Sequence, residues 1–480
     1  MNRASRRLSL LIVLALAAAG CSGSDGSEPA TTTTSGTAAP ATTTTTAASI
    51  TTTATTPPAE DDGVEVDGVT VTADTIYVGL LADLSGPFSG NVVDLIDAQL
   101  VFWSDLNESG GIAGRQVELL IEDTGYDLAR HQAAYERLKD RVVFFSHSTG
   151  SQHTADIADD LVADERLAVA VSWYSGWADP DLGANVIETG SNYCLEAMNG
   201  LSAITAVHLE QTGALPTLAI ATDAGEYGED SAAGARFLAE ELGLEVRVDL
   251  GGTIDPLQDK SAIGSQIATN APDWTWLATD PISTAEIVAA ALTSGYEGAW
   301  SGAMPSFSPR LLATELGGYL GATWWLSVLF APVGADVDGM PEVYAALADA
   351  FPDRYPSDGV IKGYLEFATT KQILERAAEM GDLTPQGVLE ARDELGGLQF
   401  AGISPPTVFA DNLNDAATRE TALYRPNKEI FDAQGGLNAT FAEAAIAPYD
   451  LVRGFSVSDF AANFTFDGPC YTIAIPADAG

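Results

Sequence analysis

Short apolar runs alternate with amphipathic stretches from residue 75 onward, and this alternation constrains the fold more than any other feature of the chain. TIYVGLLA (75–82) and QVELLIED (116–123) have the character of strands, whereas residues 91–109 and 127–140 have the apolar spacing of helices. Strands made mainly of Val, Ile, Leu and Ala are typical of a parallel sheet that is covered on both faces. The sequence therefore predicts an α/β fold.

The same alternation begins again in the middle of the chain. A helix near residues 195–211 precedes the apolar run LAIAT (218–222), and further helical stretches separate that run from WTWLAT (274–279). Two successive units of this length predict two doubly wound, Rossmann-like lobes.

The later segments are assigned to lobes by the same pattern. We expect the first lobe to comprise 68–191 and 306–415, and the second lobe to comprise 192–305 and 416–480. The run WWLSVLF (324–330) is interpreted as a return to the first sheet. After about residue 400 the pattern becomes turn-rich and predicts no definite element.

The N-terminal residues have the layout of an export signal. Residues 1–20 combine an Arg-bearing start with an apolar run, and AAGCS around Cys21 resembles a bacterial lipobox. That interpretation predicts a lipid on Cys21 that anchors the protein at the outer face of the cell membrane. An ordinary secretory signal with an incidental cysteine is the alternative. The Thr-rich residues 21–67 predict a disordered tether.

The charge of the chain limits the partners that it can bind, and its cysteines bear on a disulfide. Lys and Arg number 22 against 67 Asp and Glu, giving a formal net charge of −45, which repels nucleic acid and anionic lipid. We expect a monomer whose contact with the membrane is through the Cys21 lipid alone. In an oxidising compartment Cys194 and Cys470 predict a disulfide, because two remaining cysteines there usually pair.

Signatures of catalysis are scarce in this sequence. It contains no GxSxG, GxxxxGK[ST], HExxH, CxxC or strand-linked GxGxxG, and only four histidines. We therefore predict no enzyme activity, no cofactor and no metal. An exported hydrolase that uses Ser148 or Asp280 is the weaker alternative, since no sequence signal supplies an oxyanion hole.

Three loops stand where ligands usually bind in open α/β lobes, beyond the carboxyl ends of strands. SHSTGSQHT (146–154) follows a strand and opens a helix, although plain helix capping would explain it equally well. DAGEYGED (223–230) has the same geometry in the second unit and projects Tyr227 from a tight turn. VSWYSGWADPDLG (171–183) interleaves aromatic rings with small and polar residues, which is typical of a binding wall.

Two stretches carry a resemblance to a known family. IYVGLLADLSGPFSG (76–90) and the segment from Ala98 to Asp127, with its N-x-x-GGI-x-GR motif, are similar to the opening of type I periplasmic substrate-binding proteins. The branch they resemble is typified by leucine/isoleucine/valine-binding protein. The resemblance implies two lobes joined by three crossovers that close on a small ligand and deliver it to the permease of an ABC importer. A ligand sensor of a signalling system is the alternative.

The resemblance also implies particular ligand contacts. Ser148 corresponds to the serine whose hydroxyl holds a ligand carboxylate, and Tyr227 corresponds to the tyrosine of the second-lobe YG turn. Residues 173–177 correspond to the next loop, which meets the same carboxylate. The candidate contacts are Ser148, Thr149, Trp173, Tyr174, Ser175, Gly176, Trp177, Tyr193, Tyr227, Asp280 and Met304.

One departure from the family pattern bears on the ligand. Where amino-acid binders place a glutamate against the ligand ammonium, SGAMPSFS (301–308) has Met304. An ammonium buried without a carboxylate partner is costly. Asp280 and Glu226 are candidate substitutes for the missing glutamate. We expect an amino-acid-like or amide-like ligand that is flatter and more apolar than a common α-amino acid.

Overall fold

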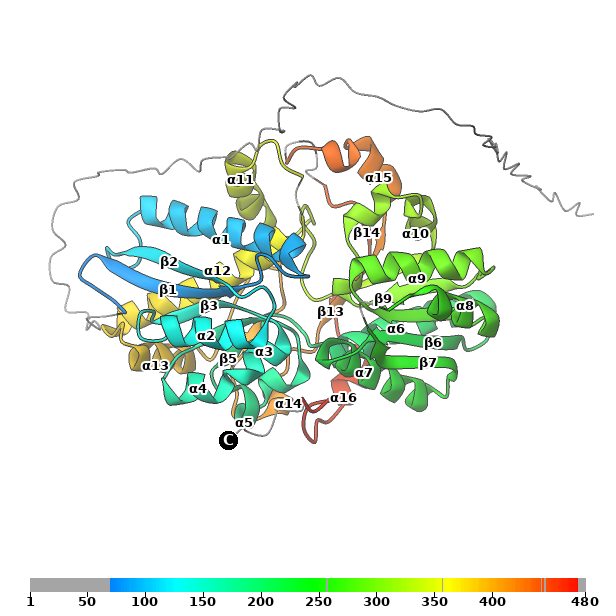
Figure 1. The fold of residues 1–480 in the computed structure, drawn as a ribbon, viewed down its shortest axis with the longest axis horizontal. Helices are drawn as coiled ribbons and strands as arrows, with labels where there is room; N and C mark the ends of the chain where they lie inside the picture. Colours follow the sequence, from blue (N-terminus) through cyan, green and yellow to red (C-terminus); the bar gives the residue numbers. More distant parts are fainter. Residues whose placement is uncertain (1–69, 256–257, 356, 442, 444–445, 474–480) are drawn as a thin grey trace, which may run out of the picture. The chain divides into compact units, whose positions relative to one another are not determined.

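A computed structural model of the chain describes residues 70–255, 258–355, 357–441, 443 and 446–473. All of them belong to the compact unit Pro57–Gly480. Cys21 and the whole of the predicted signal and tether lie outside the described residues. This unit contains two large sheets, one built from early strands (blue to cyan in Figure 1) and one built mainly from green strands.

The first lobe is organised around a five-stranded parallel sheet in the order β2-β1-β3-β4-β5. Its strands are β1 (Thr75–Ala82), β2 (Gln116–Asp123), β3 (Phe144–Thr149), β4 (Ala168–Val171) and β5 (Val186–Ile187). Its helices are α1 (Ser89–Glu108), α2 (Leu128–Leu138), α3 (Ser151–Asp156), α4 (Ala158–Ala163), α5 (Pro180–Gly183), α11 (Met340–Ala350), α12 (Gly359–Met380) and α13 (Pro385–Leu395). A small antiparallel pair, β11 (Gly397–Leu398) and β12 (Thr407–Val408), follows them.

The second lobe is organised around a seven-stranded sheet in the order β14-β13-β10-β9-β8-β6-β7. Its strands are β6 (Thr217–Asp223), β7 (Glu245–Ile254), β8 (Trp274–Ala278), β9 (Ala299–Gly302), β10 (Trp324–Val328), β13 (Thr421–Pro426) and β14 (Tyr449–Ser456). Its helices are α6 (Tyr193–Thr212), α7 (Glu226–Leu242), α8 (Ser261–Asn270), α9 (Pro281–Thr293), α10 (Gly317–Thr323), α14 (Leu413–Ala416), α15 (Lys428–Ala433) and α16 (Asp459–Asn463). β13 and β14 run antiparallel to their neighbours, whereas the other strands are parallel.

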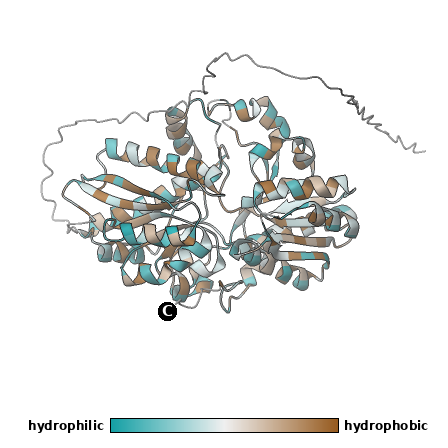
Figure 2. Cartoon of the chain, in the orientation of Figure 1, coloured by the Kyte–Doolittle hydropathy of each residue, from teal (hydrophilic) through white to brown (hydrophobic). Residues whose placement is uncertain are grey.

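Helices cover both faces of each parallel sheet, as the apolar strands require. In β6, Leu218 and Ile220 pack with α6 and α7, while the alternating Ala219 and Ala221 pack with α8 and α9. Figure 2 shows the same division, with strands that are largely brown and helices that carry both colours. This confirms the predicted α/β class.

The two sheets share one strand order, and this positions the site. The parallel strands are numbered here by their order along the chain within each lobe. In both sheets the second strand lies at one edge, followed by the first, third, fourth and fifth: β2-β1-β3-β4-β5 in the first lobe and β7-β6-β8-β9-β10 in the second. In sheets of this order the chain changes direction between the first and third strands, and ligands bind beyond the carboxyl ends at that point. The loops after β1, β3, β6 and β8 are therefore the expected binding loops.

The assignment of residues 324–330 to the first sheet is wrong. β10 pairs with β9 and with β13, so it is a strand of the second sheet. A strand buried on both faces has no side-specific pattern, and its sequence does not reveal which sheet it joins. Val328 belongs to the second-lobe core and Leu329 to the first-lobe core, so the chain changes lobes between these two residues.

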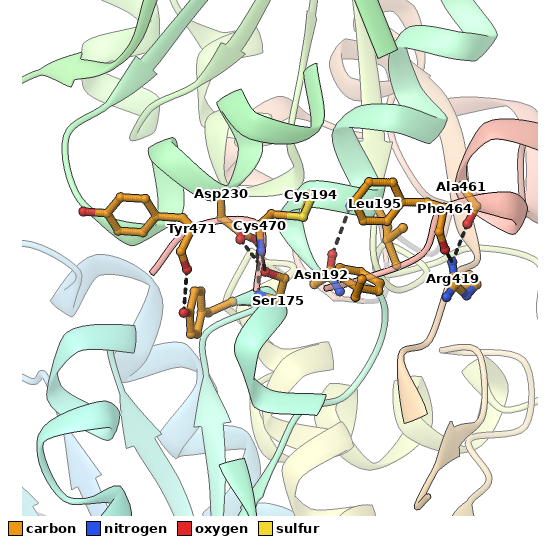
Figure 3. Close-up of a disulfide and its surroundings, with 12 residues drawn as sticks. Ser175, Asn192, Cys194, Leu195, Asp230, Arg419, Ala461, Phe464, Cys470 and Tyr471 are labelled. Atoms are coloured by element: carbon orange, nitrogen blue, oxygen red, sulfur yellow. Dashed lines mark hydrogen bonds between the residues drawn. A yellow bond between two sulfur atoms is a disulfide. The ribbon is translucent and has the colours of Figure 1, made fainter. Parts of the chain in front are cut away.

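The C-terminal segment is also shared between the lobes, although we expected it to lie wholly in the second. β13 and β14 belong to the second sheet, but the side chain of Ile473 packs in the first-lobe core that contains Tyr135 and Phe145. The predicted Cys194–Cys470 disulfide is confirmed and ties this segment to α6 (Figure 3). Among the described residues, no helix is both long and apolar enough to cross a membrane.

Candidate functional site

A cavity of about 190 Å³ lies at the carboxyl ends of strands from both lobes. Phe88 follows β1, Ser151 follows β3, and Asp280 follows β8, while Asp223 ends β6. This is the place that the strand order favours for a ligand. Both lobes therefore contribute walls to one cavity.

The cavity brings together some of the predicted contacts and leaves others out. Those that line it are Thr149, Trp173, Tyr193, Tyr227, Asp280 and Met304. Those outside the lining are Ser148, Tyr174, Ser175, Gly176 and Trp177.

Ser148 was assigned to the ligand by resemblance, but its side chain faces away from the cavity. Its hydroxyl lies 3.1 Å from Nε2 of His131 and 2.8 Å from Oγ1 of Thr154, and it is fully buried. Successive side chains of a strand point to opposite faces, so Ser148 and Thr149 cannot both face the ligand. Thr149 is the one that lines the cavity.

The stretch 174–177 joins parts of the protein instead of lining the cavity. Its residues form a 3₁₀ turn (Ser175–Ala178) in which the Tyr174 hydroxyl donates to the carbonyl of Tyr471 at 2.6 Å. The Ser175 hydroxyl donates to Asp230 of α7 at 2.5 Å and accepts from the Cys470 amide at 2.8 Å (Figure 3). These contacts occupy both side chains, and neither residue lines the cavity.

Gly176 and Trp177 are held in the same turn. A side chain at Gly176 would meet the ring of Tyr174, and the indole of Trp177 donates to the hydroxyl of Ser172 at 2.9 Å. The rings of Tyr174 and Trp177 pack edge to face at 5.4 Å. Packing explains both rings without a ligand.

Trp173 is the aromatic residue of this stretch that reaches the cavity. Its indole N–H donates to the carbonyl of Thr189 at 2.8 Å, which fixes the ring. The ring lies 6.0 Å from that of Tyr193, which in turn lies 4.7 Å from that of Tyr227. Three aromatic residues from both lobes thus form one continuous wall.

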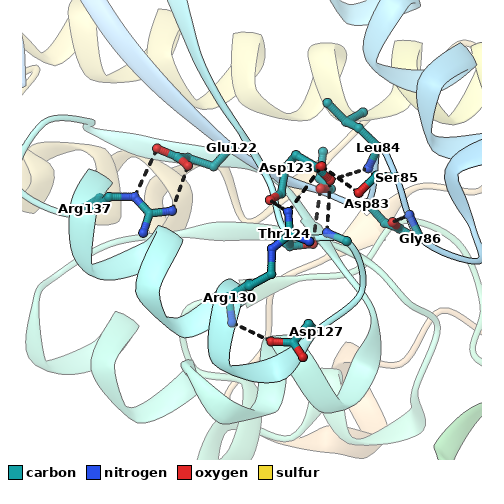
Figure 4. A network of polar contacts seen from close by, with 12 residues as sticks. Asp83, Leu84, Ser85, Gly86, Glu122, Asp123, Thr124, Asp127, Arg130 and Arg137 are labelled. Atoms are coloured by element: carbon teal, nitrogen blue, oxygen red, sulfur yellow. Dashed lines mark hydrogen bonds and ion pairs between the residues drawn. The ribbon is translucent and has the colours of Figure 1, made fainter.

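Two further aromatic residues, Phe88 and Tyr126, line the cavity and were missed by the sequence analysis. Their rings lie 4.7 Å apart, on loops that are joined by the carboxylate of Asp123 (Figure 4). Asp123 accepts hydrogen bonds from the amides of Leu84 and Gly125, both at 3.0 Å. Tyr126 has a φ of 57°, which is uncommon outside glycine and often marks a functional loop. The polar residues flanking these loops, DLSG and EDTG, were the available signal.

One end of the cavity is acidic. Asp280 accepts hydrogen bonds from the first amides of α9, and its own amide donates to Oδ2 of Asp223 at 3.1 Å. Oδ1 of Asp223 is buried and has no hydrogen-bond partner among the described residues. Burial, reinforced by the nearby Asp280 carboxylate, raises the pKa of Asp223 to about 7. Asp223 was not among the predicted contacts.

The cavity lining also contains a group of apolar side chains. Met304 lines the cavity together with Leu95 of α1, Leu326 and Val328 of β10, and Phe330. The amide of Met304 donates to the buried Glu196 at 2.8 Å, so this carboxylate supports the loop and does not line the cavity. No cluster of three or more His, Cys, Asp or Glu in the described ranges has the arrangement of a metal site.

Comparisons with known proteins agree with this fold. A family model described as periplasmic binding protein matches residues 75–429. A search of curated proteins gave no match. Among solved structures, the chain is similar to a fatty acid ABC transporter substrate-binding protein from Thermomonospora curvata, with 25% identity and a TM-score of 0.74. That alignment covers 84% of this chain and 97% of the other.

Two more distant structures share the fold. A branched chain amino acid ABC transporter protein from Thermus thermophilus with bound valine is 17% identical with a TM-score of 0.66, covering 81% of this chain and 97% of that one. A possible leucine/isoleucine/valine-binding protein from Rhodopirellula baltica is 15% identical with a TM-score of 0.60, covering 75% and 96%.

Proposed function

This chain belongs to the periplasmic binding protein family, and we propose that it captures a small molecule between its two lobes for an ABC importer. The observation that carries the proposal is the cavity at the carboxyl ends of both sheets, to which each lobe contributes side chains. The names of the similar solved structures support it, because they describe substrate-binding proteins of ABC transporters.

Closure of the lobes is the proposed working motion. A ligand that touches Trp173 of the first lobe and Tyr227 of the second gains both sets of contacts only when the lobes are together. It therefore favours the closed state, which a permease can distinguish from the open one. An amide hydrogen bond from Gln152 to Glu226 at 3.3 Å already connects α3 with α7 in this structure.

The proposed ligand is small and has both an apolar part and a hydrogen-bonding part. The cavity of about 190 Å³ is smaller than the ~300–1,000 Å³ of sites for drug-sized ligands. Met304, Leu326 and Phe330 would contact an apolar group, and Asp223 would accept from an N–H donor. Of the two ligand classes expected from sequence, an amino-acid-like zwitterion fits this combination less well than an amide-like ligand, and a ligand with an N–H donor and no carboxylate is the broader class that fits it.

We also propose that Cys21 carries the lipid that anchors the protein outside the cytoplasm. The AAGCS motif and the Thr-rich stretch behind it support this proposal. Mass spectrometry of the N-terminal peptide from the membrane fraction tests it. A diacylated Cys21 is expected, and release of the Cys21→Ala variant into the medium should accompany its loss. An unmodified cysteine in mature protein would contradict the anchor.

A thermal-shift screen tests the binding function. The panel contains amino acids, amides, ureas, amines, aromatic acids and fatty acids, and a ligand at 100 times its Kd should add about 2.7 kcal/mol of stability. Tyr227→Ala should abolish the shift, whereas Tyr227→Phe should retain most of it, because the hydroxyl makes only a 3.5 Å contact with Thr279. A shift that survives Tyr227→Ala and Trp173→Ala would place binding elsewhere. Failure of every compound, with no ligand co-purifying, would contradict the function.

A further inference from the structure

We propose that the ligand carries a cationic nitrogen and no carboxylate, so that it is an amine or amidine with a small apolar body. The inference rests on the proposed function and names the chemical class of its ligand. Two observations support it. Several carboxylates line the cavity, and the groups that would have to bind an anion already have partners within the protein.

The acidic end contains one carboxylate oxygen that lacks a hydrogen bond in the described part of the chain. Asp223 is 7% exposed, lines the cavity, and has a buried Oδ1 with no hydrogen-bond partner among the described residues. A buried carboxylate oxygen without a donor is unfavourable, and a charged N–H group relieves this most effectively. Glu226 and Asp280 line the same end and add negative charge around it.

The first-lobe position where an anionic ligand group would bind is already taken by the protein. Oε1 of Glu226, from the second lobe, accepts from the amide of Gln152 in the first turn of α3. This carboxylate also faces Tyr126 and His153, on whose pKa values it acts. A ligand carboxylate would have to displace Glu226 or lie beside it, and two like charges at one site repel.

The hydroxyl of Thr149 is committed to a buried network. It lies 2.5 Å from Nε2 of His147, whose Nδ1 lies 3.0 Å from the Glu366 carboxylate. The hydroxyl also accepts from the Asp83 amide at 3.3 Å, so the protein already supplies two of its hydrogen-bond partners. Ser148, the other expected donor, faces away from the cavity.

Lys362, the cationic residue of the cavity lining, also has partners within the protein. Four lining residues carry carboxyl groups and only Lys362, among those described, carries a cation. Its ammonium donates to Oγ1 of Thr189 at 2.9 Å, lies 3.9 Å from Glu366 and sits 5.0 Å from the centre of the Trp173 ring. Lys362 is therefore balanced within the protein, and a ligand anion would compete with Glu366 for it.

Three probes of equal length test the inference by isothermal titration calorimetry on the purified protein: hexylamine, hexanamide and hexanoate. Hexylamine should bind about tenfold or more tightly than hexanamide, since a charged hydrogen bond replaces a neutral one. Hexanoate should not bind measurably. Hexanoate affinity equal to or above that of hexylamine, or equal affinity for the amide and the amine, would overturn the inference.

The outcomes separate this inference from the function on which it rests. If none of the three probes binds, the compound found by the thermal-shift panel decides: a cation without a carboxylate supports the inference, and any carboxylate overturns it. A carboxylate that binds in a Tyr227-dependent way would leave the binding function intact. Only if no compound of the panel binds would both the binding function and the inference about its ligand be contradicted.

Variants identify the atoms involved. Asp223→Asn, which preserves size, should weaken hexylamine about tenfold and leave hexanamide within about twofold. Glu226→Gln should allow hexanoate to bind, whereas Glu286→Gln, which removes an exposed charge from α9 of the same lobe, should change neither affinity. Unchanged thermal midpoints of the variants without ligand show that they fold. Equal effects of Glu226→Gln and Glu286→Gln would contradict the role of Glu226.

Discussion

The two lobes repeat one strand order but present different chemistry to the cavity. In the first lobe, the hydroxyls of Ser148 and Thr149 are bonded to His131 and His147 inside the lobe. In the second lobe, Asp223 ends β6, the counterpart of β1, and has one oxygen without a partner among the described residues.

The difference shows how two lobes of the same fold can have different roles. Polar groups of the first lobe stabilise the cavity wall, and polar groups of the second lobe are available to a ligand. The first-lobe groups are held by a buried network that reaches Glu366 of α12, so their polarity stabilises the wall. Asp223 of the second lobe lies at a strand end at the switch point, where one of its oxygens has no hydrogen bond among the described residues. Binding specificity therefore lies in the side chains at the strand ends, because the fold itself is common to both lobes.

The largest expected effect comes from removing a first-lobe wall residue. Trp173 is 7% exposed, so Trp173→Ala should lower the free energy of unfolding by about 3–5 kcal/mol and abolish ligand binding. Chemical denaturation followed by circular dichroism measures the first effect. Trp325→Ala, at a partly exposed tryptophan of β10, is the control and should cost less. Equal losses in both variants would show that Trp173 has no special place in the wall.

The disulfide should give the next largest effect. It closes a loop of 276 residues and holds a C-terminal segment that contacts both lobes, so Cys470→Ser should lower the free energy of unfolding by about 2–5 kcal/mol. Wild-type protein under dithiothreitol should match the variant, and the variant should not respond to the reductant. If reduction leaves the wild-type midpoint unchanged, the segment is held by its other contacts, including Tyr174 with Tyr471.

A smaller effect on ligand affinity is expected when Asp123, which holds the loops of Phe88 and Tyr126 together, is replaced. Asp123→Ala removes the acceptor for the Leu84 and Gly125 amides and should weaken binding roughly twofold to tenfold, because both rings must then be ordered when the ligand binds. Titration calorimetry with the best ligand measures the change. The neighbouring Glu122→Ala removes only the pair with Arg137 and should leave affinity unchanged (Figure 4). A loss of the same size in Glu122→Ala would contradict the positioning role.

Much of the fold could be predicted because it follows from local periodicity. The bounds of β1 and β2 agree with the apolar runs 75–82 and 116–123 residue for residue. β10 was placed in the wrong sheet, since a strand that is apolar on both faces fits either sheet and only its pairing with β9 and β13 decides.

The site could be predicted only in part. Thr149, Tyr227 and Asp280, which line the cavity, were predicted because they lie at or beyond the carboxyl ends of strands. That Tyr174 lies outside the cavity could not be predicted, because its partner, the Tyr471 carbonyl, is 297 residues away in sequence and leaves no local signal. Asp223 was overlooked because a single aspartate at a strand end has no distinctive pattern, and its importance comes from the oxygen that folding leaves unpartnered.

The most direct test follows from the protonation of Asp223. Its pKa of about 7 reflects burial first and then the Asp280 carboxylate, which raises it, with Lys260 lowering it and Asp255 raising it. The Asp280 amide also donates to it, and Tyr227 lies close by. A cation binds the ionised carboxylate, so affinity should approach its maximum well above pH 7 and should fall as Asp223 becomes protonated around and below pH 7.

The measurement is the Kd of hexylamine between pH 5.5 and 8.5, by calorimetry, for the wild-type protein and for Asp223→Asn. Wild-type affinity should fall with decreasing pH below about 7, by up to about tenfold per pH unit, while the Asn variant binds weakly with little pH dependence. If both proteins show the same slope, or if affinity rises as the pH falls, the cation does not bind at Asp223. The proposed division between a supporting first lobe and a ligand-recognising second lobe would then be wrong.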